Sequence, residues 1–296
     1  SYVAKDEAGA IVGHVGFCPT AFQGAGLNDA VSTLHMIDWL GSPGHPMVGA
    51  RLMRKAHESA QTQFGLGGSA AARVVSKRGG YIALPTVPVY HRVLRPGCWL
   101  RTPGLGPLAK ASRTARDVMK EARRRISAAP SNPITPERIF TFGDEIRPIV
   151  AQAMRHAVFT SREPGRLNRM LAYPGRRFTG WSLQDASGRA RGFALLNVID
   201  RHEGRVRLGV IVDCVLDDTD PRLWQGAMAA LDDELKRQNA DLAQTFAAPP
   251  WTAEGLQRAG YTTRFSLEFS LRDHHNLIPR TGPFHFTPIE ADYAYT

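Results

Sequence analysis

The chain has 296 residues, enough for one large domain or for two domains of ordinary size. Hydrophobic residues make up 43% and charged residues 22%, as in soluble globular proteins, and the longest apolar runs, such as ALLNVI, are too short to span a membrane. The formal net charge of +10 favours an anionic partner: a phosphorylated molecule, nucleic acid or an acidic membrane surface. The cysteines Cys18, Cys98 and Cys214 match neither a disulfide framework nor a zinc motif, which favours a reducing, cytoplasmic compartment.

The first predicted elements in chain order are a hairpin and a buried strand. Residues 2–17, YVAKDEAGAIVGHVGF, alternate polar and apolar side chains around turns that contain glycine, which predicts two antiparallel strands. The run VSTLHMIDWLG at 31–41 predicts a third strand. Pro46 then opens a helical pattern over 47–63, since proline is favoured in the first turn of a helix. The rest of this half follows in order: a short strand, a helix at 69–78, the pair Gly80-Tyr81 and a closing strand.

A helix is also predicted where the chain leaves this first half. Between 108 and 126, apolar residues recur at spacings of three and four, which is typical of an amphipathic helix. These apolar residues are Leu108, Ala111, Ala115, Val118, Met119, Ala122 and Ile126. The other faces carry basic residues: Lys110, Arg113, Arg116, Lys120, Arg123, Arg124 and Arg125. Two interpretations stay open: a solvated linker helix lying on one domain, or a basic helix that binds an anionic membrane surface or, less readily, nucleic acid.

The second half repeats the order of the first half. Its matching elements are a hairpin at 181–196, a strand at 206–216, a helix at 221–239, a short strand, a helix at 251–259, the pair Gly260-Tyr261 and a closing strand. Asp38 precedes Pro46 by eight residues, and Asp213 precedes Pro221 by eight residues as well. Each half therefore reads β-β-β-α-β-α-β. A strand at 138–143 and helices at 144–157 and 164–173 stand in front of the second copy, and we expect their counterparts in the first copy to be absent or supplied from elsewhere.

Two stretches of the first half resemble motifs of the GNAT acetyltransferases. SAAARVVSKRGGY at 69–81 is similar to the family's fourth-helix pattern, and MVGARLM at 47–53 resembles the end of its acyl-CoA pyrophosphate loop. The whole chain resembles the tandem two-domain members, including those encoded with bacterial polysaccharide genes. The resemblance implies an α+β or α/β fold with two tandem GNAT-like domains, each a mixed, mostly antiparallel sheet flanked by helices, the first lacking its opening strand and helices. The implied domains are an N-terminal domain at 1–98 with the acyl-CoA site, a basic linker helix at 99–134, a degenerate copy at 135–274 and a tail at 275–296.

The loop between the strand at 31–41 and the helix after it has the composition that a pyrophosphate requires. GSPGHPMVGAR at 41–51 is glycine-rich, carries no acid and leads into a helix start, where N–H groups can bind phosphate oxygens. The candidate residues for acetyl-CoA or another acyl-CoA are Gly44, His45, Met47, Val48, Gly49, Ala50 and Arg51. The equivalent loop of the second half carries Asp217, Asp218 and Asp220, whose like charge would repel a phosphate. The alternative for 41–51 is an ordinary tight loop before a helix.

The candidate catalytic residues lie on two elements of the first half. Acyl transfer to an amine needs a base and donors for the oxyanion. His35 and Asp38 are three apart, so they would face opposite sides of a regular strand unless a bulge intervenes, as GNAT proteins often have there. Ser76 stands where the family usually has its tyrosine general acid. Because Asp213 matches Asp38 in the repeat, a structural role of this position in capping the following loop is the alternative.

Arginines ahead of the second hairpin are candidates for binding the acceptor. Arg162, Arg166 and Arg177 could bind an acidic or phosphorylated acceptor, and ordinary surface charge is the alternative. The run DHH at 273–275 together with His285 matches no metal-ligand spacing, so no metal site is expected.

The leading hypothesis is an acyl-CoA-dependent N-acyltransferase that acts on an amine of a small molecule, a sugar or a polysaccharide precursor. It would work in the cytoplasm or at the inner face of the membrane. One alternative is a Fem-like transferase that uses aminoacyl-tRNA, which the basic helix would suit. The other is a non-catalytic pseudo-acetyltransferase that binds a ligand or acts as a scaffold. The acceptor, the acyl chain and the oligomeric state stay open.

Overall fold

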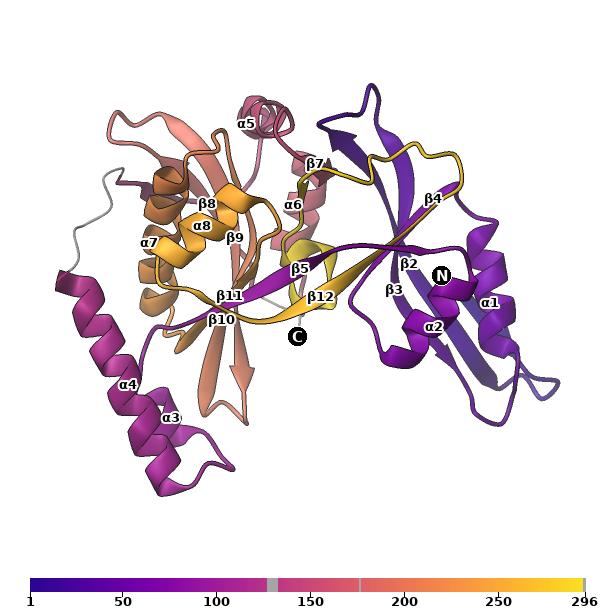
Figure 1. The fold of residues 1–296 in the computed structure, drawn as a ribbon, viewed down its shortest axis with the longest axis horizontal. Coiled ribbons are helices and arrows are strands. Elements are labelled where there is room, and N and C mark those ends of the chain that lie inside the picture. The colour runs from indigo at the N-terminus through magenta and orange to yellow at the C-terminus, as the bar shows by residue number, and fades with distance from the viewer. Residues whose placement is uncertain (127–132, 176, 295–296) are drawn as a thin grey trace. The chain divides into compact units, whose positions relative to one another are not determined.

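The computed structural model describes residues 1–126, 133–175 and 177–294. The chain forms two compact units (Figure 1). Unit 1 consists of 1–87, 157–161 and 266–284, and unit 2 consists of 88–156, 162–265 and 285–296. The units cut across the boundaries expected at 98 and 274, because each unit receives a strand from the other half of the sequence. The domain boundaries expected from the sequence describe the repeat in the chain, and they stay a prediction.

Unit 1 contains a mixed sheet in the order β7-β2-β3-β4-β12, with β1 paired to β2. Its elements are β1 (Tyr2–Lys5), β2 (Ile11–Gly24), β3 (Val31–Gly41), α1 (Val48–His57), β4 (Thr62–Leu66), α2 (Ala70–Arg78), β7 (Val158–Thr160) and the end of β12 (Thr262–Asp273). Leu52 and Ala56 of α1 pack against Val15 of β2. The helix expected over 47–63 ends at His57, because Gln63 belongs to β4 and donates its side-chain amide to the Ala56 carbonyl oxygen at 2.5 Å.

Unit 2 contains a sheet in the order β5-β11-β10-β9-β8-β6. Its strands are the end of β5 (Ile82–Val93), β6 (Thr135–Ile139), β8 (Thr179–Gln184), β9 (Ala190–Arg201), β10 (Val206–Leu216) and β11 (Leu242–Phe246). Its helices are α3 (Cys98–Arg101), α4 (Pro107–Ile126), α5 (Arg147–Ala153), α6 (Pro164–Leu171), α7 (Pro221–Arg237) and α8 (Pro250–Arg258). Short 3-10 turns lie at Asp144–Ile146, Pro288–Glu290 and Asp292–Ala294, and β13 (Phe284–His285) lies where unit 1 ends.

The strand expected at 138–143 is instead β6, which ends at Ile139. The strand ends there because the backbone of Phe142 forms hydrogen bonds with the side chain of Asn168. The backbone N–H of Phe142 donates to Asn168 Oδ1 of α6 at 2.8 Å, and the Asn168 amide donates back to the Phe142 carbonyl oxygen at 2.9 Å. This reciprocal pair takes the hydrogen-bonding groups that a longer strand would have used.

The internal repeat is confirmed at the level of strand register. In unit 1 the parallel pairing of β3 with β4 begins at Thr33 and Thr62, and in unit 2 the parallel pairing of β10 with β11 begins at Leu208 and Leu242. The first members of these pairs, Thr33 and Leu208, are 175 positions apart. The same offset relates two β-bulges, one at Ile37 of β3 and one at Val212 of β10. Such a match is expected of two copies of one architecture.

The closing strands of the two halves are exchanged. β5 begins in unit 1 and ends in unit 2, where Val93 pairs with Leu242 of β11. β12 begins in unit 2 and ends in unit 1, where Asp273 pairs with Thr62 of β4. Figure 1 labels both strands. Each unit therefore has a complete sheet only because the other half of the sequence supplies one of its strands.

Candidate functional site

The predicted acyl-CoA corner lies in unit 1, between the end of β3 and the start of α1. The loop closes on itself, since the backbone N–H of His45 donates to the Ser42 carbonyl oxygen at 3.0 Å and that of Val48 to the His45 carbonyl oxygen at 3.3 Å. Met47 precedes the helix with a left-handed backbone (φ 75°) and makes no side-chain cap. The first turn of α1 also carries no acidic residue. The N-terminal N–H groups of a helix lack intrahelical partners, so this corner offers donors and a positive dipole end to an anion.

Small residues allow the strand end and the helix start to approach closely. A Cβ at Gly41 would lie 3.3 Å from the backbone nitrogen of Gly49, and a Cβ at Gly49 would lie 3.2 Å from the Trp39 ring. Trp39 Nε1 donates to the Gly49 carbonyl oxygen at 2.9 Å, which fixes the first turn of α1 against β3. Sequence reasoning did not single out Trp39, although an aromatic residue two positions before the loop was a visible signal.

The candidate acyl-CoA residues are brought together at this corner with different exposure. Gly44, Met47, Ala50 and Arg51 are exposed, whereas His45, Val48 and Gly49 are half-buried. Within the part of the chain that the structure describes, the buried His45 Nδ1 has no hydrogen-bond partner. A buried polar atom without a partner is unusual, so His45 adds a hydrogen-bonding group that a ligand could satisfy.

The equivalent corner of unit 2 is filled with carboxylates. Asp220 precedes α7 and accepts the backbone N–H of Arg222 at 2.8 Å, which caps the helix. Asp217 and Asp218 pair with Arg191 at 2.9 and 3.2 Å. The first unit thus offers an acid-free helix start where the second has a carboxylate in contact with the helix N–H groups.

The β-bulge at Ile37 brings the two catalytic candidates of β3 to one face. Asp38 lies opposite Gly16 and His35 opposite Cys18, and these two partners are two residues apart on β2. Residues two apart on a strand share a face, so Asp38 and His35 share one as well. A Cβ at Gly16 would lie 3.2 Å from the His14 ring, which places His14 on this face too. Helix α1 covers the opposite face, where a Cβ at Gly13 would meet Val48.

The candidates differ in their access to solvent. His35 is buried and its ring stacks on Phe64 with centroids 4.5 Å apart, whereas Asp38 is exposed. Ser76 lies half-buried in α2, near the end of the helix, where its carbonyl oxygen accepts the backbone N–H of Tyr81 at 3.0 Å. Asp38 is therefore the candidate that a substrate could reach without displacing the core.

Arg162 lies in the core of unit 2. Its guanidinium pairs with Asp213 at 2.7 Å and with Glu290 at 2.5 Å, and all three side chains are buried. Burial opposes the charge of Arg162 most strongly, but the two carboxylates raise its pKa above the ordinary value. Asp213, the counterpart of Asp38, is therefore a structural residue of unit 2. A role of Arg162 in binding an acceptor, as expected from the sequence, conflicts with this placement.

The other arginines expected to bind the acceptor are more accessible. Arg166 is half-buried on α6, and Arg177 is exposed just before β8. Arg176, which stands beside Arg177, lies outside the described residues. Nothing in their placement ties these arginines to the corner at α1. Across 1–126, 133–175 and 177–294, the structure shows no group of three or more His, Cys, Asp or Glu side chains that could hold a metal ion.

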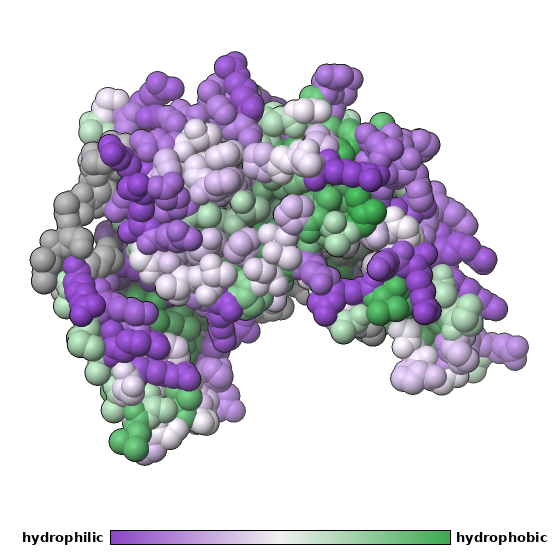
Figure 2. All heavy atoms as spheres, in the orientation of Figure 1, coloured by the Kyte–Doolittle hydropathy of each residue, from purple (hydrophilic) through white to green (hydrophobic). Residues whose placement is uncertain are grey.

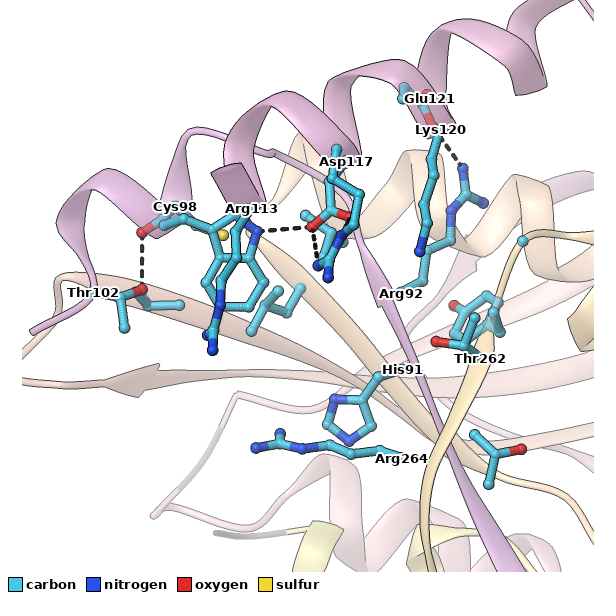
Figure 3. Close-up of a pocket in the computed structure, with 18 of the residues that line it drawn as sticks. His91, Arg92, Cys98, Thr102, Arg113, Asp117, Lys120, Glu121, Thr262 and Arg264 are labelled. Atoms are coloured by element: carbon cyan, nitrogen blue, oxygen red, sulfur yellow. Dashed lines mark hydrogen bonds and ion pairs between the residues drawn. The ribbon is translucent and has the colours of Figure 1, made fainter. Parts of the chain in front are cut away.

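Unit 2 also contains a cavity of about 790 Å³ beside α4 (Figure 3). Its lining is strongly basic, with Arg92, Arg113, Arg116, Lys120 and Arg264. The two lining acids are already paired, Glu121 with Arg92 at 3.3 Å and Asp117 with Arg116 at 2.9 Å. A cavity of this size and charge fits a small anionic molecule.

Burial keeps two titratable side chains of the cavity, His91 and Cys98, uncharged at neutral pH. Burial, and secondly the nearby Arg264, lower the pKa of His91 to about 4. Burial, and secondly Asp241, raise the pKa of the Cys98 thiol to about 11, so Cys98 is no candidate nucleophile. His91 lies on β5 and Arg264 on β12, which are the two exchanged strands. The cavity therefore could not be predicted from any local stretch of the sequence.

Comparison with known proteins identifies the fold. No family model matches the sequence, and no curated protein matches it. N-myristoyltransferase of Saccharomyces cerevisiae, solved with bound myristoyl-CoA and inhibitors, superposes with a TM-score of 0.58 at 10% identity, over 90% of this chain and 66% of that one. A GCN5-related N-acetyltransferase of Anabaena variabilis gives a TM-score of 0.57 at 13% identity, over 92% of this chain and 62% of that one.

A third solved structure, a probable N-acyltransferase of Enterococcus faecalis, gives a TM-score of 0.53 at 12% identity, over 88% of this chain and 58% of that one. The chain therefore spans about two thirds or less of the length of these proteins. At such low identity the similarity establishes the fold. The expected fold class, a mixed α/β structure with two GNAT-like halves, is confirmed.

Proposed function

We propose that this chain is an acyl-CoA-dependent N-acyltransferase whose thioester substrate binds to unit 1. The observation that carries the proposal is the start of α1, which has no acid and no side-chain cap, while the equivalent helix start in unit 2 is capped by Asp220. A CoA pyrophosphate needs such a helix start, because carboxylates at the same place would repel it. The donor groups at this corner therefore fit CoA, and those of the unit 2 corner do not.

The reaction would join the acyl carbon to an amine. The amine nitrogen attacks the thioester carbonyl carbon, a C–N bond forms, the C–S bond breaks, and CoA leaves as a thiolate while the nitrogen loses a proton. Asp38 is exposed on the bulged face of β3 and can accept that proton directly or through a water molecule. His35 is packed against Phe64 on the same face, so its role would be to shape the site.

The structural neighbours support an acyl-CoA donor in general terms. One of them was solved with bound myristoyl-CoA, and another is a GCN5-related N-acetyltransferase. For this chain we propose acetyl-CoA or another acyl-CoA as donor and an amine of a sugar or polysaccharide precursor as acceptor.

Calorimetric titration with CoA and acetyl-CoA, followed by a thiol-release assay on a panel of amino sugars, tests this function. We expect saturable binding of acetyl-CoA and thiol release that requires an amine. Binding without release under any acceptor would favour a ligand-binding pseudo-acetyltransferase. Absence of CoA binding would refute the proposal, and tight binding of aminoacyl-tRNA in its place would support the Fem-like alternative.

A further inference from the structure

Helix α4 packs on unit 2 through its polar side. Asp117 is buried and accepts the Trp99 indole N–H at 2.8 Å. One turn further on, Glu121 pairs with Arg92 of β5 at 3.3 Å. Near the start of the helix, Lys110 donates to the Leu100 carbonyl oxygen at 3.1 Å. Figure 3 shows Asp117, Lys120 and Glu121 extending from α4 toward the cavity.

The apolar side of α4 consequently faces away from the rest of unit 2. Leu108 is 88% exposed, Val118 51% and Met119 57%. The alanines of the same side, at 111, 115 and 122, are exposed as well. An amphipathic helix on a globular domain ordinarily buries its apolar side, so this arrangement is the reverse of the usual one. In Figure 2, hydrophobic residues gather along the outer border of the arm that α3 and α4 form.

The charge of α4 specifies what could cover this apolar side. The helix has seven basic residues and two acidic residues, a net charge of +5. Both acids, Asp117 and Glu121, are turned inward and paired. Arg123 is exposed and stands four residues after Met119, which makes it a neighbour on the helix surface. Arg113, Arg116 and Lys120 line the cavity on the inner side of the helix. The outer side is thus apolar with a basic border and carries no acid.

We propose that α4 binds to the surface of an anionic membrane, with Leu108, Val118 and Met119 inserted among the lipid chains. A helix that lies in the interface needs an apolar side for the acyl region and basic side chains for the anionic headgroups, and α4 presents both outward. Long basic side chains can keep their charges at headgroup level while their stems lie along the apolar side. No helix within the described residues is long and apolar enough to cross a membrane, and a surface helix does not have to. This binding is independent of acyl transfer.

Co-sedimentation with vesicles tests the proposal on the full chain. The vesicles contain either phosphatidylcholine alone or equal parts of phosphatidylglycerol and phosphatidylcholine. We expect binding to the anionic vesicles only, and weaker binding at high salt. The triple variant L108Q/V118Q/M119Q should lower the partition coefficient at least about tenfold, since three apolar side chains no longer leave water. Arg123→Gln should lower it about fivefold, because a basic residue near an anionic surface contributes that much.

Phe140→Gln is the matched control, since Phe140 is 82% exposed in unit 2 but lies outside α4. It should bind vesicles like the unaltered protein. The triple variant changes only exposed positions, so its circular dichroism and melting temperature should stay unchanged. Equal binding of the triple variant, or equal binding to neutral vesicles, would overturn the proposal. So would a dimer that binds no vesicles and that the triple variant converts to a monomer, because the apolar side would then cover a second copy.

Discussion

Arg162 Nε lies 2.7 Å from Asp213 Oδ2, and both side chains are fully buried in unit 2. Thr287 donates its hydroxyl to Asp213 at 2.8 Å, and Glu290 binds the guanidinium from another side. The segment from His285 onward is therefore tied to β10 through a charged cluster. Because each charge is hydrogen-bonded, the cluster is tolerated in the core. Removal of one member would leave a buried charge without its partner.

Arg162→Ala should destabilise the protein by about 3–5 kcal/mol, because two buried carboxylates would lose their partner. Urea unfolding followed by tryptophan fluorescence measures this loss. Arg177→Ala is the matched control, since Arg177 is exposed, and we expect a change within about 0.5 kcal/mol. Equal effects of the two substitutions would show that Arg162 is not a structural residue.

The exchanged strands predict that the N-terminal half cannot fold alone. A fragment of residues 1–98 lacks the part of β12 that pairs with β4, where Phe269 to Asp273 lie opposite Leu66 to Thr62. In the fragment β4 would keep β3 on one side, but the strand N–H and C=O groups on its other side would lack partners. We expect the fragment to show no cooperative thermal transition by circular dichroism. A sharp transition of this fragment by itself would mean that the N-terminal half is an autonomous domain.

His285 should make stability depend on pH. Burial, the largest cause, lowers the pKa of His285 to about 4, and its ring N–H donates to the Cys214 carbonyl oxygen at 3.0 Å. The unfolded chain therefore binds more protons than the folded chain between about pH 6.5 and 4. Stability is present above that window and is lost as the pH falls through it, by on the order of 2 kcal/mol between pH 6.5 and 5. His285→Gln should show a smaller loss in urea titrations over this range, and an identical slope would contradict the assignment.

Trp39 should affect CoA binding without affecting the reaction chemistry. Its indole N–H fixes the first turn of α1 through the Gly49 carbonyl oxygen. Trp39→Phe keeps an aromatic ring but removes this donor, so the helix start would be less well ordered. We expect a three- to tenfold weaker affinity for CoA, equivalent to about 0.6–1.4 kcal/mol, by calorimetry. Ile11→Gln, an exposed position of the same unit, serves as control and should leave the affinity unchanged.

The sequence was sufficient to predict the repeated architecture, because strand periodicity, the two proline helix starts and the two Gly-Tyr pairs are local signals. The bulge at Ile37 could be expected only from the GNAT resemblance. The exchange of β5 and β12 could not be predicted, since nothing in the sequence of a closing strand indicates whether it pairs with its own half or with the other one. That choice is made by contacts between residues far apart in the sequence. Leu242 pairs with Val93 in one sheet, and Asp273 pairs with Thr62 in the other.

For the candidate site as well, features that depend on a short stretch of sequence could be predicted, and features that depend on distant contacts could not. The acid-free corner at 41–51 was predictable, because a phosphate site depends on a short stretch of backbone and on the absence of carboxylates. The burial of Arg162 was not, because its partners Asp213 and Glu290 lie 51 and 128 positions away. The orientation of α4 on unit 2 could not be predicted from the sequence either. Its periodicity predicts a helix with one apolar side, but only the contacts of Asp117 and Glu121 reveal which side meets the protein.

The central claim is that the start of α1 holds the pyrophosphate of an acyl-CoA, and substitutions at Met47 test it most directly. Met47 is exposed and has a left-handed backbone, which Asn and Asp both tolerate. Asn and Asp have nearly the same shape, so the pair differs in charge alone. Calorimetric titration with CoA should give an affinity for Met47→Asn close to that of the unaltered protein, and one at least about tenfold weaker for Met47→Asp. Equal affinities of the two variants would show that CoA, if it binds, does so elsewhere.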